Sequence, residues 1–347
     1  MKKVDYIVVG LGIGGICLCE QLKKQNKSFV TIDGGSKGAT AKSGGVFNPT
    51  VLKRFTAAWN ATAFYPAAID FYTDLSKELN VEFFTKTPIF RIFKSIEEQN
   101  NWSVASDKIE LRQFLSSNFL KNTNPSINAA FGFGEVLGTA IIKTEILLSH
   151  YRDYLQAENI LLSENFQYQL LEQQENGVCY KNISAKKIIF AEGASAINNP
   201  FFPKQTIVGN KGEYLLIQAP ELKLDTLLKG AFYVIPHGKD IYKVGATFNR
   251  DDYTDHPTET AKAEILSKLK IFINCPFKVI GQTAGVRPTT KDHRPILGSL
   301  NNHPNLVFFN GLGSRGFLMA PLLSEILINV LEKEQPLPKE MDIKRLL

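Results

Sequence analysis

A glycine-rich turn near the start of the chain constrains the fold more than any other feature of the sequence. The apolar segment 6–9 runs into Gly10, Gly12 and Gly15, which complete the pattern G-x-G-x-x-G. A predicted helix follows, and a second apolar strand, 29–32, ends in an aspartate. This order of strand, turn, helix, strand and acid is typical of a β-α-β unit that binds a dinucleotide.

Each part of this unit has a physical task. Gly10 permits the tight turn, Gly12 lets the backbone approach a pyrophosphate, and Gly15 lets the helix pack closely on the strand. The N–H groups at the start of the helix attract phosphates. Asp33 is placed to accept hydrogen bonds from ribose hydroxyls, which favours FAD or NAD over NADP. A structural turn without a ligand is the alternative interpretation.

The composition predicts a globular protein of about two domains. The chain has 347 residues, 44% of them hydrophobic, and its net charge of +6 is spread without a block of like charges. That balance would suit an anionic ligand or a polyanionic partner, but a mildly basic solvated surface is the favoured interpretation. The four cysteines form neither a disulfide framework nor a metal-binding pattern, so we expect no metal site.

The N-terminus also has the basic and apolar character of a secretory signal. Asp5 interrupts this segment, its glycines weaken a helix, and no cleavage site follows before Glu20. No other run approaches the roughly 18 apolar residues that span a bilayer. We therefore expect a cytoplasmic protein without a membrane span.

The predicted elements indicate two interleaved domains, because parts that suit a nucleotide-binding domain recur at the beginning, middle and end of the chain. We predict an α/β fold in which a Rossmann-like domain is interleaved with a mostly antiparallel β-sheet substrate domain. The nucleotide-binding domain is assigned to residues 1–80, 135–205 and 284–347, and the substrate-binding domain to residues 81–134 and 206–283. Such strand-rich insertions fit a two-domain flavoprotein better than a simple dehydrogenase.

Within these parts, periodicity predicts a helix over about 57–79, an exposed antiparallel strand over 82–93 and a strand around 166–172. A second set of glycines resembles a nucleotide-binding fingerprint in its spacing: Gly132, Gly134 and Gly138. No apolar strand precedes them, and the chain has no C-x-x-C motif. We therefore expect one dinucleotide, and the interleaved organisation favours FAD.

A second glycine-rich turn near the C-terminus, 310–317, follows a buried strand and opens a helix. The N-terminus of that helix suits the pyrimidine edge of a flavin, where it stabilises the negative charge of the reduced ring. Ser314 is a candidate cap for this helix, and an ordinary helix entry is the alternative. The residues predicted to contact FAD are Gly10, Gly12, Ile13, Gly14, Gly15, Asp33, Gly34, Lys42, Ser43, Gly44, Phe166, Ala191, Gly193, Arg287, Gly311, Gly313, Ser314, Arg315, Gly316 and Phe317.

Arg287 is the main candidate for substrate binding. It lies between the end of an apolar strand and a turn, and its guanidinium can grip a substrate carboxylate with two hydrogen bonds. A structural ion pair, for example with Asp292, is an equal alternative. Tyr233 could supply a second donor, although half-buried packing is the commoner role of a lone tyrosine in a strand. His237 and His293 are further candidates for handling protons, but surface or structural roles are favoured for both.

At these residues the chain resembles the D-amino-acid oxidase family of FAD oxidoreductases, which includes glycine oxidase and sarcosine oxidase. The resemblance covers nearly the whole length, and its marks are the N-terminal fingerprint and the runs 190–194, 233–236, 244–247 and 285–298. Residues 313–316 and 320–322 are most similar to the oxidase half of the bifunctional tRNA 5-methylaminomethyl-2-thiouridine biosynthesis enzyme.

The resemblance implies that Arg287 binds the substrate carboxylate, that Tyr233 assists it, and that the loop 311–318 covers a non-covalently bound FAD. The glycine-oxidase type has a polar or basic residue two places before the glycine that matches Gly316; here that place is Ser314, and Arg315 is shifted by one. This departure leaves the substrate open.

Three functions follow. The first is oxidation of the C–N bond of a carboxylate-bearing amine or amino acid by hydride transfer to flavin N5. The second is removal of a carboxymethyl group from a modified wobble uridine of tRNA, which clustering of Lys42, Lys53, Arg54 and Lys291 at one mouth would favour. The third is a non-catalytic flavin-binding protein. The electron acceptor and the oligomeric state stay open.

Overall fold

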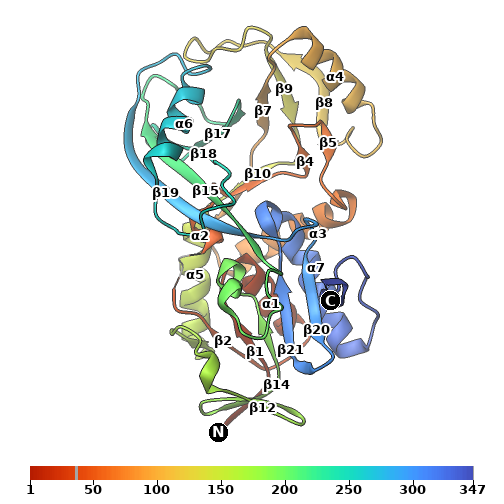
Figure 1. The fold of residues 1–347 in the computed structure, drawn as a ribbon. Coiled ribbons are helices and arrows are strands. Elements are labelled where there is room, and N and C mark those ends of the chain that lie inside the picture. The colour runs from red at the N-terminus through yellow and green to blue at the C-terminus, as the bar shows by residue number, and fades with distance from the viewer. Residues whose placement is uncertain (36–37, 347) are drawn as a thin grey trace.

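The computed structural model describes residues 1–35 and 38–346, which form two stacked parts, each built around its own large sheet (Figure 1). Both ends of the chain lie in the lower part in Figure 1, together with the N-terminal strand and the last helix. The upper part contains the second large sheet. Strands from the middle of the chain connect the two parts, so neither is a continuous segment.

The lower part is built around a sheet with the parallel strand order β11-β2-β1-β14, and β21 extends it along the second half of β14. The antiparallel strands β13 and β12 follow the first half of β14, and β20 pairs with β21. The bounds are β1 Lys2–Val9, β2 Phe29–Ile32, β11 Leu161–Leu162, β12 Leu171–Gln174, β13 Gly177–Tyr180, β14 Ile183–Phe190, β20 Ile296–Leu300 and β21 His303–Asn310.

Helices cover one face of this sheet. They are α1 Ile13–Lys24, α3 Ala61–Glu78, α5 Thr144–Ala157 and α7 Gly316–Lys333. Their apolar side chains join those of β1, β14 and β21 in one core. On the opposite face, Phe190 stacks on Phe308 with ring centroids 5.8 Å apart, at the centre of a second apolar cluster. The parallel strands are therefore buried on both faces, as a Rossmann-like sheet requires.

The sequence was expected to contain no segment long and apolar enough to span a membrane, but the last of these helices is such a segment. By length and composition the segment Gly313–Lys333 would suffice to cross a membrane, with a mean hydropathy of 1.3. In the structure α7 packs against α1 and α3, and Leu323 and Leu327 are fully buried there. Its place in the core accounts for its apolar sequence.

The upper part is a second sheet with the order β19-β15-β18-β17-β16-β7-β9-β8, antiparallel except for the β16–β7 pair. The bounds are β7 Ile89–Ile92, β8 Leu115–Leu120, β9 Phe133–Val136, β15 Val208–Gln218, β16 Leu227–Lys229, β17 Tyr233–Pro236, β18 Ile241–Gly245 and β19 Lys278–Thr289. Two helices, α4 Ile96–Ser106 and α6 Glu259–Leu269, add to the cores on its two faces.

Short elements lie between the two large sheets. One small sheet has the order β3-β10-β6, and β4 and β5 form a hairpin. Their bounds are β3 Val46–Phe47, β4 Thr50–Val51, β5 Thr56–Ala57, β6 Phe84–Lys86 and β10 Ala140–Ile142. The remaining helical turns are α2 Ala39–Lys42, η1 Tyr168–Leu170, η2 Gly193–Asn198, η3 Gly313–Arg315 and η4 Ile343–Leu346.

The mixed α/β fold is confirmed, and three element predictions need correction. The helix predicted from residue 57 begins at Ala61, because Ala57 pairs in β5. The predicted strand 82–93 is wrong as one element: it divides into β6 and β7, which belong to different sheets, and Pro88 lies between them. The predicted strand around 166–172 begins with the turn η1 and pairs only from Leu171.

The imitation fingerprint at Gly132, Gly134 and Gly138 is not a nucleotide site. These glycines flank or lie in β9, which pairs antiparallel with β7 and β8. An added Cβ at Gly134 would lie 2.6 Å from the Trp102 ring, so this glycine makes room for core packing. The predicted domain boundaries at 134/135 and 283/284 fall inside β9 and β19, and the domain assignment stays a prediction.

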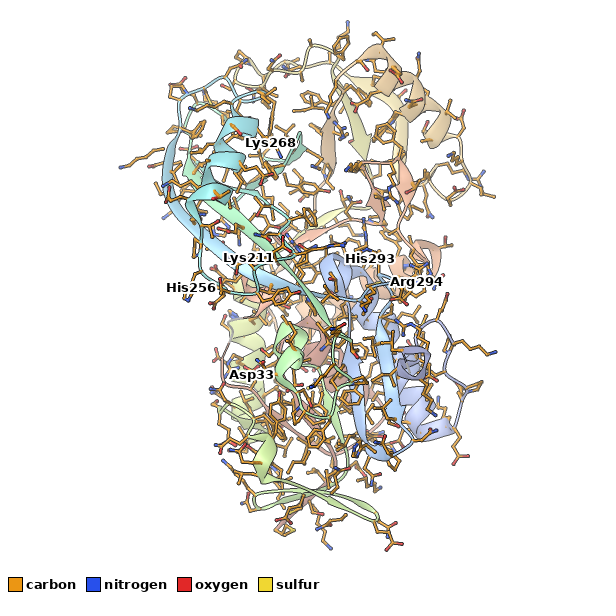
Figure 2. All side chains as sticks on the ribbon, viewed as in Figure 1. Asp33, Lys211, His256, Lys268, His293 and Arg294 are labelled. Carbon is orange, nitrogen blue, oxygen red and sulfur yellow. The ribbon has the colours of Figure 1, made fainter. Side chains whose placement is uncertain are left out.

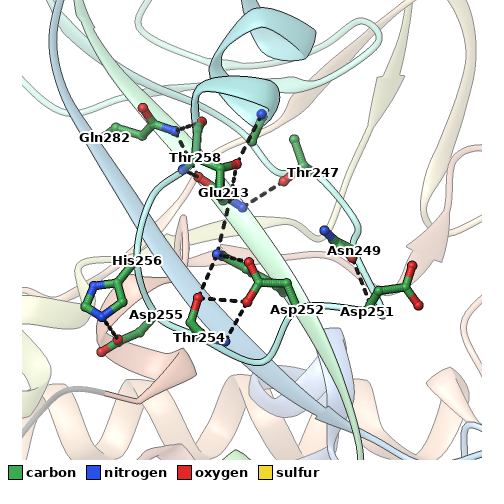
Figure 3. A network of polar contacts seen from close by, with 12 residues as sticks. Glu213, Thr247, Asn249, Asp251, Asp252, Thr254, Asp255, His256, Thr258 and Gln282 are labelled. Atoms are coloured by element: carbon green, nitrogen blue, oxygen red, sulfur yellow. Dashed lines mark hydrogen bonds and ion pairs between the residues drawn. The ribbon is translucent and has the colours of Figure 1, made fainter.

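A buried polar network fixes the loop 246–258 to β15 (Figure 3). Lys211 is 1% exposed, and its Nζ lies 2.5 Å from Asp252 Oδ2 and 3.8 Å from Glu213 Oε1. The Glu213 carboxylate in turn accepts hydrogen bonds of 2.8 Å from the Thr258 backbone N–H and from its hydroxyl. Each buried charge is therefore paired, and the loop beside it is held in place.

Removing the cation from this network is expected to destabilise the protein. Lys211→Met leaves Glu213, 3% exposed, without its neighbouring ammonium group, so we expect unfolding to become easier by about 3 kcal/mol. Urea unfolding of the variant and of Lys278→Met, which changes an exposed lysine on β19, measures the difference. Equal losses in the two variants would show that the network contributes nothing.

Candidate active site

The N-terminal turn has the geometry that its glycines predict. Gly10 has φ +96°, and an added Cβ at Gly15 would lie 1.9 Å from the Gly10 carbonyl oxygen. Gly12 has φ −78° and ψ −170°, which any residue can adopt, so this position needs no glycine for its backbone. The first turn of α1 has no acidic residue and no side-chain cap from Gly12. The helix N-terminus is thus free of a competing anion.

Asp33 lies at the carboxyl end of β2, in the lower part of the molecule (Figure 2). Its Oδ2 accepts a hydrogen bond of 2.8 Å from the backbone N–H of Leu11, and its Oδ1 accepts one of 2.9 Å from the backbone N–H of Gly35. Oδ1 also forms an ion pair with Arg152. A carboxylate has about four acceptor sites, so these bonds leave capacity for a ribose hydroxyl. The ion pair with Arg152 was not expected from the sequence.

Two further predicted residues lie near Asp33. An added Cβ at Gly34 would meet Asn165, whose neighbour Phe166 stacks on Tyr180 with centroids 4.6 Å apart. The segment that contains Phe166 therefore runs beside the end of β2. A role for either residue in cofactor binding stays a prediction.

The carboxyl ends of the three central parallel strands bring other predicted residues together. An added Cβ at Gly10 would lie 2.6 Å from the carbonyl oxygen of Ala191. Asn310, at the end of β21, donates its side-chain N–H to the carbonyl oxygen of Gly193 at 2.9 Å. This edge of an open α/β sheet is where ligands bind.

The C-terminal turn meets the N-terminal turn directly. An added Cβ at Gly316 would lie 3.1 Å from Cγ2 of Ile13, and Gly311 and Gly313 have positive φ angles of +74° and +55°. The prediction of Ser314 as a cap is wrong, because η3 precedes α7 and Arg315 takes the cap position without a side-chain bond. Phe317, which follows Gly316 in the first turn of α7, is buried in the core.

Arg315 joins this turn to the segment before the β4–β5 hairpin. Its Nη1 donates to the carbonyl oxygen of Asn48 at 2.9 Å and its Nη2 to that of Thr50 at 3.0 Å. Burial lowers its pKa, and the nearby Tyr233 opposes this shift. The guanidinium thus lies beside Tyr233, at the boundary between the two parts of the molecule.

Arg287 is on β19, and its guanidinium folds over Gly212 of β15, where an added Cβ would lie 2.0 Å from Nη2. Its Nη1 and Nη2 lie 3.3 and 3.4 Å from the carbonyl oxygen of Thr247, and Nη1 lies 3.4 Å from that of Asn210. Such long hydrogen bonds to neutral acceptors are weak. Burial lowers the pKa of Arg287, and the adjacent Tyr214 opposes that shift.

The structural ion pair considered for Arg287 is not formed. Asp292 instead pairs with Arg345, whose Nε lies 2.9 Å from Oδ2 of Asp292. In the described part of the chain no carboxylate oxygen lies within 4.0 Å of the Arg287 guanidinium. The Arg287 cation is therefore part-buried and available to an anionic ligand.

Two tyrosines lie on the sheet face that carries Arg287, and Tyr214 is the one next to its guanidinium. Tyr214 on β15 and Tyr233 on β17 both pair with Gly245 of β18, so both rings lie on the same face of the sheet, separated by a glycine. The Tyr233 hydroxyl accepts a hydrogen bond of 3.0 Å from Asn48 Nδ2, and burial raises its pKa. A neutral hydroxyl there can still donate a hydrogen bond to a ligand.

The predicted segment 42–44 lies against this face. An added Cβ at Gly44 would lie 2.4 Å from Ile235 Cδ1 and 3.1 Å from the Tyr214 ring, and Ser43 accepts a 2.7 Å hydrogen bond from Lys243 Nζ through its carbonyl oxygen. Lys42 contacts Gly285 of β19. The segment therefore connects the nucleotide-binding turn to the sheet of the upper part.

Some site residues were missed by the sequence reasoning, notably Tyr214, Asn48 and Lys243. A signal was available for Tyr214: alternation along β15 puts Asn210, Gly212 and Tyr214 on one face. The strand order that brings this face to Tyr233 is not visible in the sequence. His237 and His293, considered for proton handling, are exposed.

Comparison with known proteins decides the family. Residues 5–330 match the DAO family model, described as FAD dependent oxidoreductase. The chain belongs to this family. This enzyme is 23% identical to the glycine oxidase of Bacillus subtilis (strain 168), over 94% of each chain. It is also 25% identical to the tRNA 5-methylaminomethyl-2-thiouridine biosynthesis bifunctional protein MnmC of Idiomarina loihiensis, over 93% of this chain and 55% of that protein. It thus spans about half of MnmC.

Solved structures share the fold of this FAD-dependent oxidoreductase. Glycine oxidase from Bacillus cereus superposes with a TM-score of 0.81 and 15% identity, over 96% of this chain and 98% of that chain. L-proline dehydrogenase from P. horikoshii gives a TM-score of 0.80 and 16% identity, over 99% and 98% of the two chains. FAD is thus the cofactor, and the N-terminus of α1, which has no acidic residue in its first turn and lies beside close-packed glycines, fits its pyrophosphate.

Proposed function

We propose that the enzyme oxidises the C–N bond of an amine or amino acid that bears a carboxylate. The observation that carries the proposal is Arg287: a part-buried guanidinium without a carboxylate partner, beside Tyr214 and on the same sheet face as Tyr233. An arginine in this setting suits bidentate binding of a carboxylate. Relatives named glycine oxidase and iminodiacetate oxidase support this substrate class.

The chain's own residues would hold both the cofactor and the substrate. Residues 10–15 would cradle the FAD pyrophosphate, Asp33 the ribose, and the turn 311–317 the flavin ring, all without a covalent bond. The bound flavin supplies a hydride acceptor at N5. Arg287 would fix the substrate carboxylate, and the Tyr233 hydroxyl would add a donor, so that the Cα–H is oriented for transfer.

No side chain is required as a general base if the amine reacts in its neutral form. The groups that surround the Arg287 guanidinium are Asn210, Tyr214, Thr247 and Phe248, of which none is a base at neutral pH. Loss of hydride from the Cα of a neutral amine leaves an iminium cation, which water hydrolyses to a carbonyl compound and a protonated amine. The site residues act by positioning.

An anaerobic titration tests the proposal. The purified holoenzyme is mixed with glycine, sarcosine, proline and D-amino acids, and bleaching of the flavin absorbance is followed. We expect at least one carboxylate-bearing amine to bleach the flavin completely. A protein that carries FAD and is bleached by none of them would be the non-catalytic flavin-binding protein instead.

A second candidate is oxidation of a modified wobble uridine in tRNA, supported by the similarity to MnmC. The exposed Phe248, whose ring centroid is 4.6 Å from Arg287 Cζ, offers a stacking surface for a base. The basic cluster expected for RNA gains no support: in Figure 1, α2, which carries Lys42, lies at the left where the two parts meet, whereas β4 and β5, whose hairpin carries Arg54, lie farther right and higher. Bleaching by undermodified tRNA that weakens steeply with salt would favour this candidate.

A cytoplasmic location is part of the proposal. The four cysteines, Cys17, Cys19, Cys179 and Cys275, are buried and free. Free thiols in a chain of this size suit a reducing compartment.

A further inference from the structure

The sheet face that carries Tyr214 and Tyr233 has more positive charges than are needed to bind one substrate carboxylate. Besides Arg91, which is paired with Glu98, four basic side chains lie on or against it: Arg287, Arg315, Lys243 and Lys229. Among the residues that the structure describes, none of the four has a carboxylate oxygen within 4.0 Å. Part-buried charges are normally paired with an opposite charge. These four cations therefore indicate that anionic groups of a ligand bind at this face.

Lys229 is the member of this set that lies farthest from Arg287 along the sheet. Cα pairing gives one continuous row, Tyr214–Gly245–Tyr233–Lys229–Arg91, across β15, β18, β17, β16 and β7. Side chains in such a row point to the same face. Three strand spacings separate Tyr214 from Lys229, which is roughly 14 Å. A single carboxylate cannot reach both ends of this row.

The Lys229 ammonium group is poorly satisfied where it lies. Within residues 1–35 and 38–346, its hydrogen-bond acceptors are the carbonyl oxygens of Gly230 at 3.1 Å and Ala231 at 2.9 Å, and its Nζ is 5.0 Å from the Tyr233 ring centroid. The neighbouring Arg91 already has a partner, because its Nη2 lies 3.1 Å from Glu98 Oε1. Burial, with Arg91 and Lys94, lowers the pKa of Lys229 to about 8.

We propose that Lys229 binds a second anionic group of the substrate, so that the preferred substrate is an amine with two anionic ends, one held by Arg287 and the other by Lys229. The proposal rests on the proposed function and specifies its substrate. The matching chemistry is an N-substituted glycine whose substituent ends several bonds away in a carboxylate or a phosphate. Tyr233, between the two cations, would face the linking chain.

Paired substrate series test this proposal. Anaerobic flavin reduction is measured with N-alkylglycines and with N-(ω-carboxyalkyl)glycines and N-(ω-phosphonoalkyl)glycines of equal chain length. We expect the anionic tails to raise kcat/KM by about tenfold to a hundredfold, the gain typical of one charge-assisted hydrogen bond. The carboxylate and phosphonate arms show which anion fits. Equal kcat/KM for charged and uncharged tails would overturn the proposal.

Variants assign the effect to Lys229. Lys229→Met should abolish the preference for an anionic tail while leaving kcat/KM for uncharged tails within about twofold, and Lys229→Arg should restore it. Lys278→Met, an exposed lysine at the far end of β19, should keep the preference. A preference that survives Lys229→Met, or that is lost only in Lys243→Met, contradicts the assignment.

The pH dependence supplies an independent readout. The titratable and charged groups around Lys229 are Arg91 in β7, Lys94 just after that strand and Tyr233 on β17, and Glu98 on α4 pairs with Arg91. Because the anion requires a protonated Lys229, the ratio of kcat/KM between charged and uncharged tails should fall as pH rises above about 8. The ratio cancels titration of the amine and the flavin. A ratio that stays constant from pH 7 to 10 would contradict the proposal.

Failure of the proposed function would be recognised separately. If no amine of any series bleaches the flavin, calorimetric titration of the holoenzyme with α,ω-dicarboxylates still tests the anion site. Weaker binding to Lys229→Met than to Lys278→Met supports a site at Lys229 without catalysis. Equal affinity in the two variants overturns it.

Discussion

Replacing Arg287 with alanine is expected to lower kcat/KM for a carboxylate-bearing substrate by a factor of about a hundred to a thousand. The guanidinium is part-buried, has no carboxylate oxygen within 4.0 Å among the residues that the structure describes, and makes weak hydrogen bonds to Thr247 and Asn210. Loss of a buried, hydrogen-bonded charge from a binding partner costs about 3–4 kcal/mol, which corresponds to that range. Steady-state kinetics and flavin bleaching both measure it.

Two further variants separate the binding of the carboxylate from nonspecific effects. Arg287→Lys retains the charge and loses the planar fork, so its kcat/KM should lie between those of the parent and of the alanine variant. Arg250→Ala removes an exposed arginine from the adjacent loop and should leave the kinetics unchanged. If Arg287→Ala and Arg250→Ala behave alike, Arg287 does not bind the carboxylate.

The second large effect concerns the cofactor. Gly12→Ala is expected to leave the fold intact and to weaken FAD binding by about tenfold or more, because the backbone at this position suits any residue while the turn needs a close approach to the pyrophosphate. An added Cβ meets only the Thr40 side chain, at 3.2 Å. The FAD content of the purified protein and a titration of the apoprotein with FAD measure the effect.

A matched pair of variants controls for general damage. Gly38→Ala adds the same methyl group at a position where, its chain neighbours aside, no heavy atom of the described residues lies within 4 Å, and it should bind FAD like the parent. Gly15→Ala places the methyl 1.9 Å from a backbone oxygen and should disturb the packing of α1 on β1 as well. Full FAD occupancy in Gly12→Ala would show that the pyrophosphate does not lie on this turn.

The parts of the site that are local in sequence were predictable, and the parts that depend on strand pairing were not. The turn at Gly10 and the turn at Gly311 each carry their glycines within a few residues, and the structure brings both to one edge of the parallel sheet. Tyr214 and Lys229 join the site through a strand order, β15-β18-β17-β16, that no local pattern encodes.

Physical reasons also explain the predictions that failed. Apolar and polar residues do alternate over 82–93. Pro88, however, has no backbone N–H to donate to a neighbouring strand, and the segment is divided there between two sheets. Ser314 has the chemistry of a helix cap, yet a turn of 3-10 helix precedes α7 and moves the cap to Arg315. Asp33 was correctly placed at the end of β2, whereas its partner Arg152 comes from the distant helix α5.

The central claim is that the enzyme recognises its substrate through a carboxylate while the flavin accepts a hydride from the adjacent carbon. The most direct measurement is the rate of anaerobic flavin reduction by the best amine of the panel and by its counterpart in which a carboxamide replaces the carboxylate. We expect the carboxylate to reduce the flavin at least a hundredfold more efficiently with the parent enzyme, and the two compounds to become nearly equal with Arg287→Ala. Equal rates for both compounds with the parent enzyme would contradict the claim.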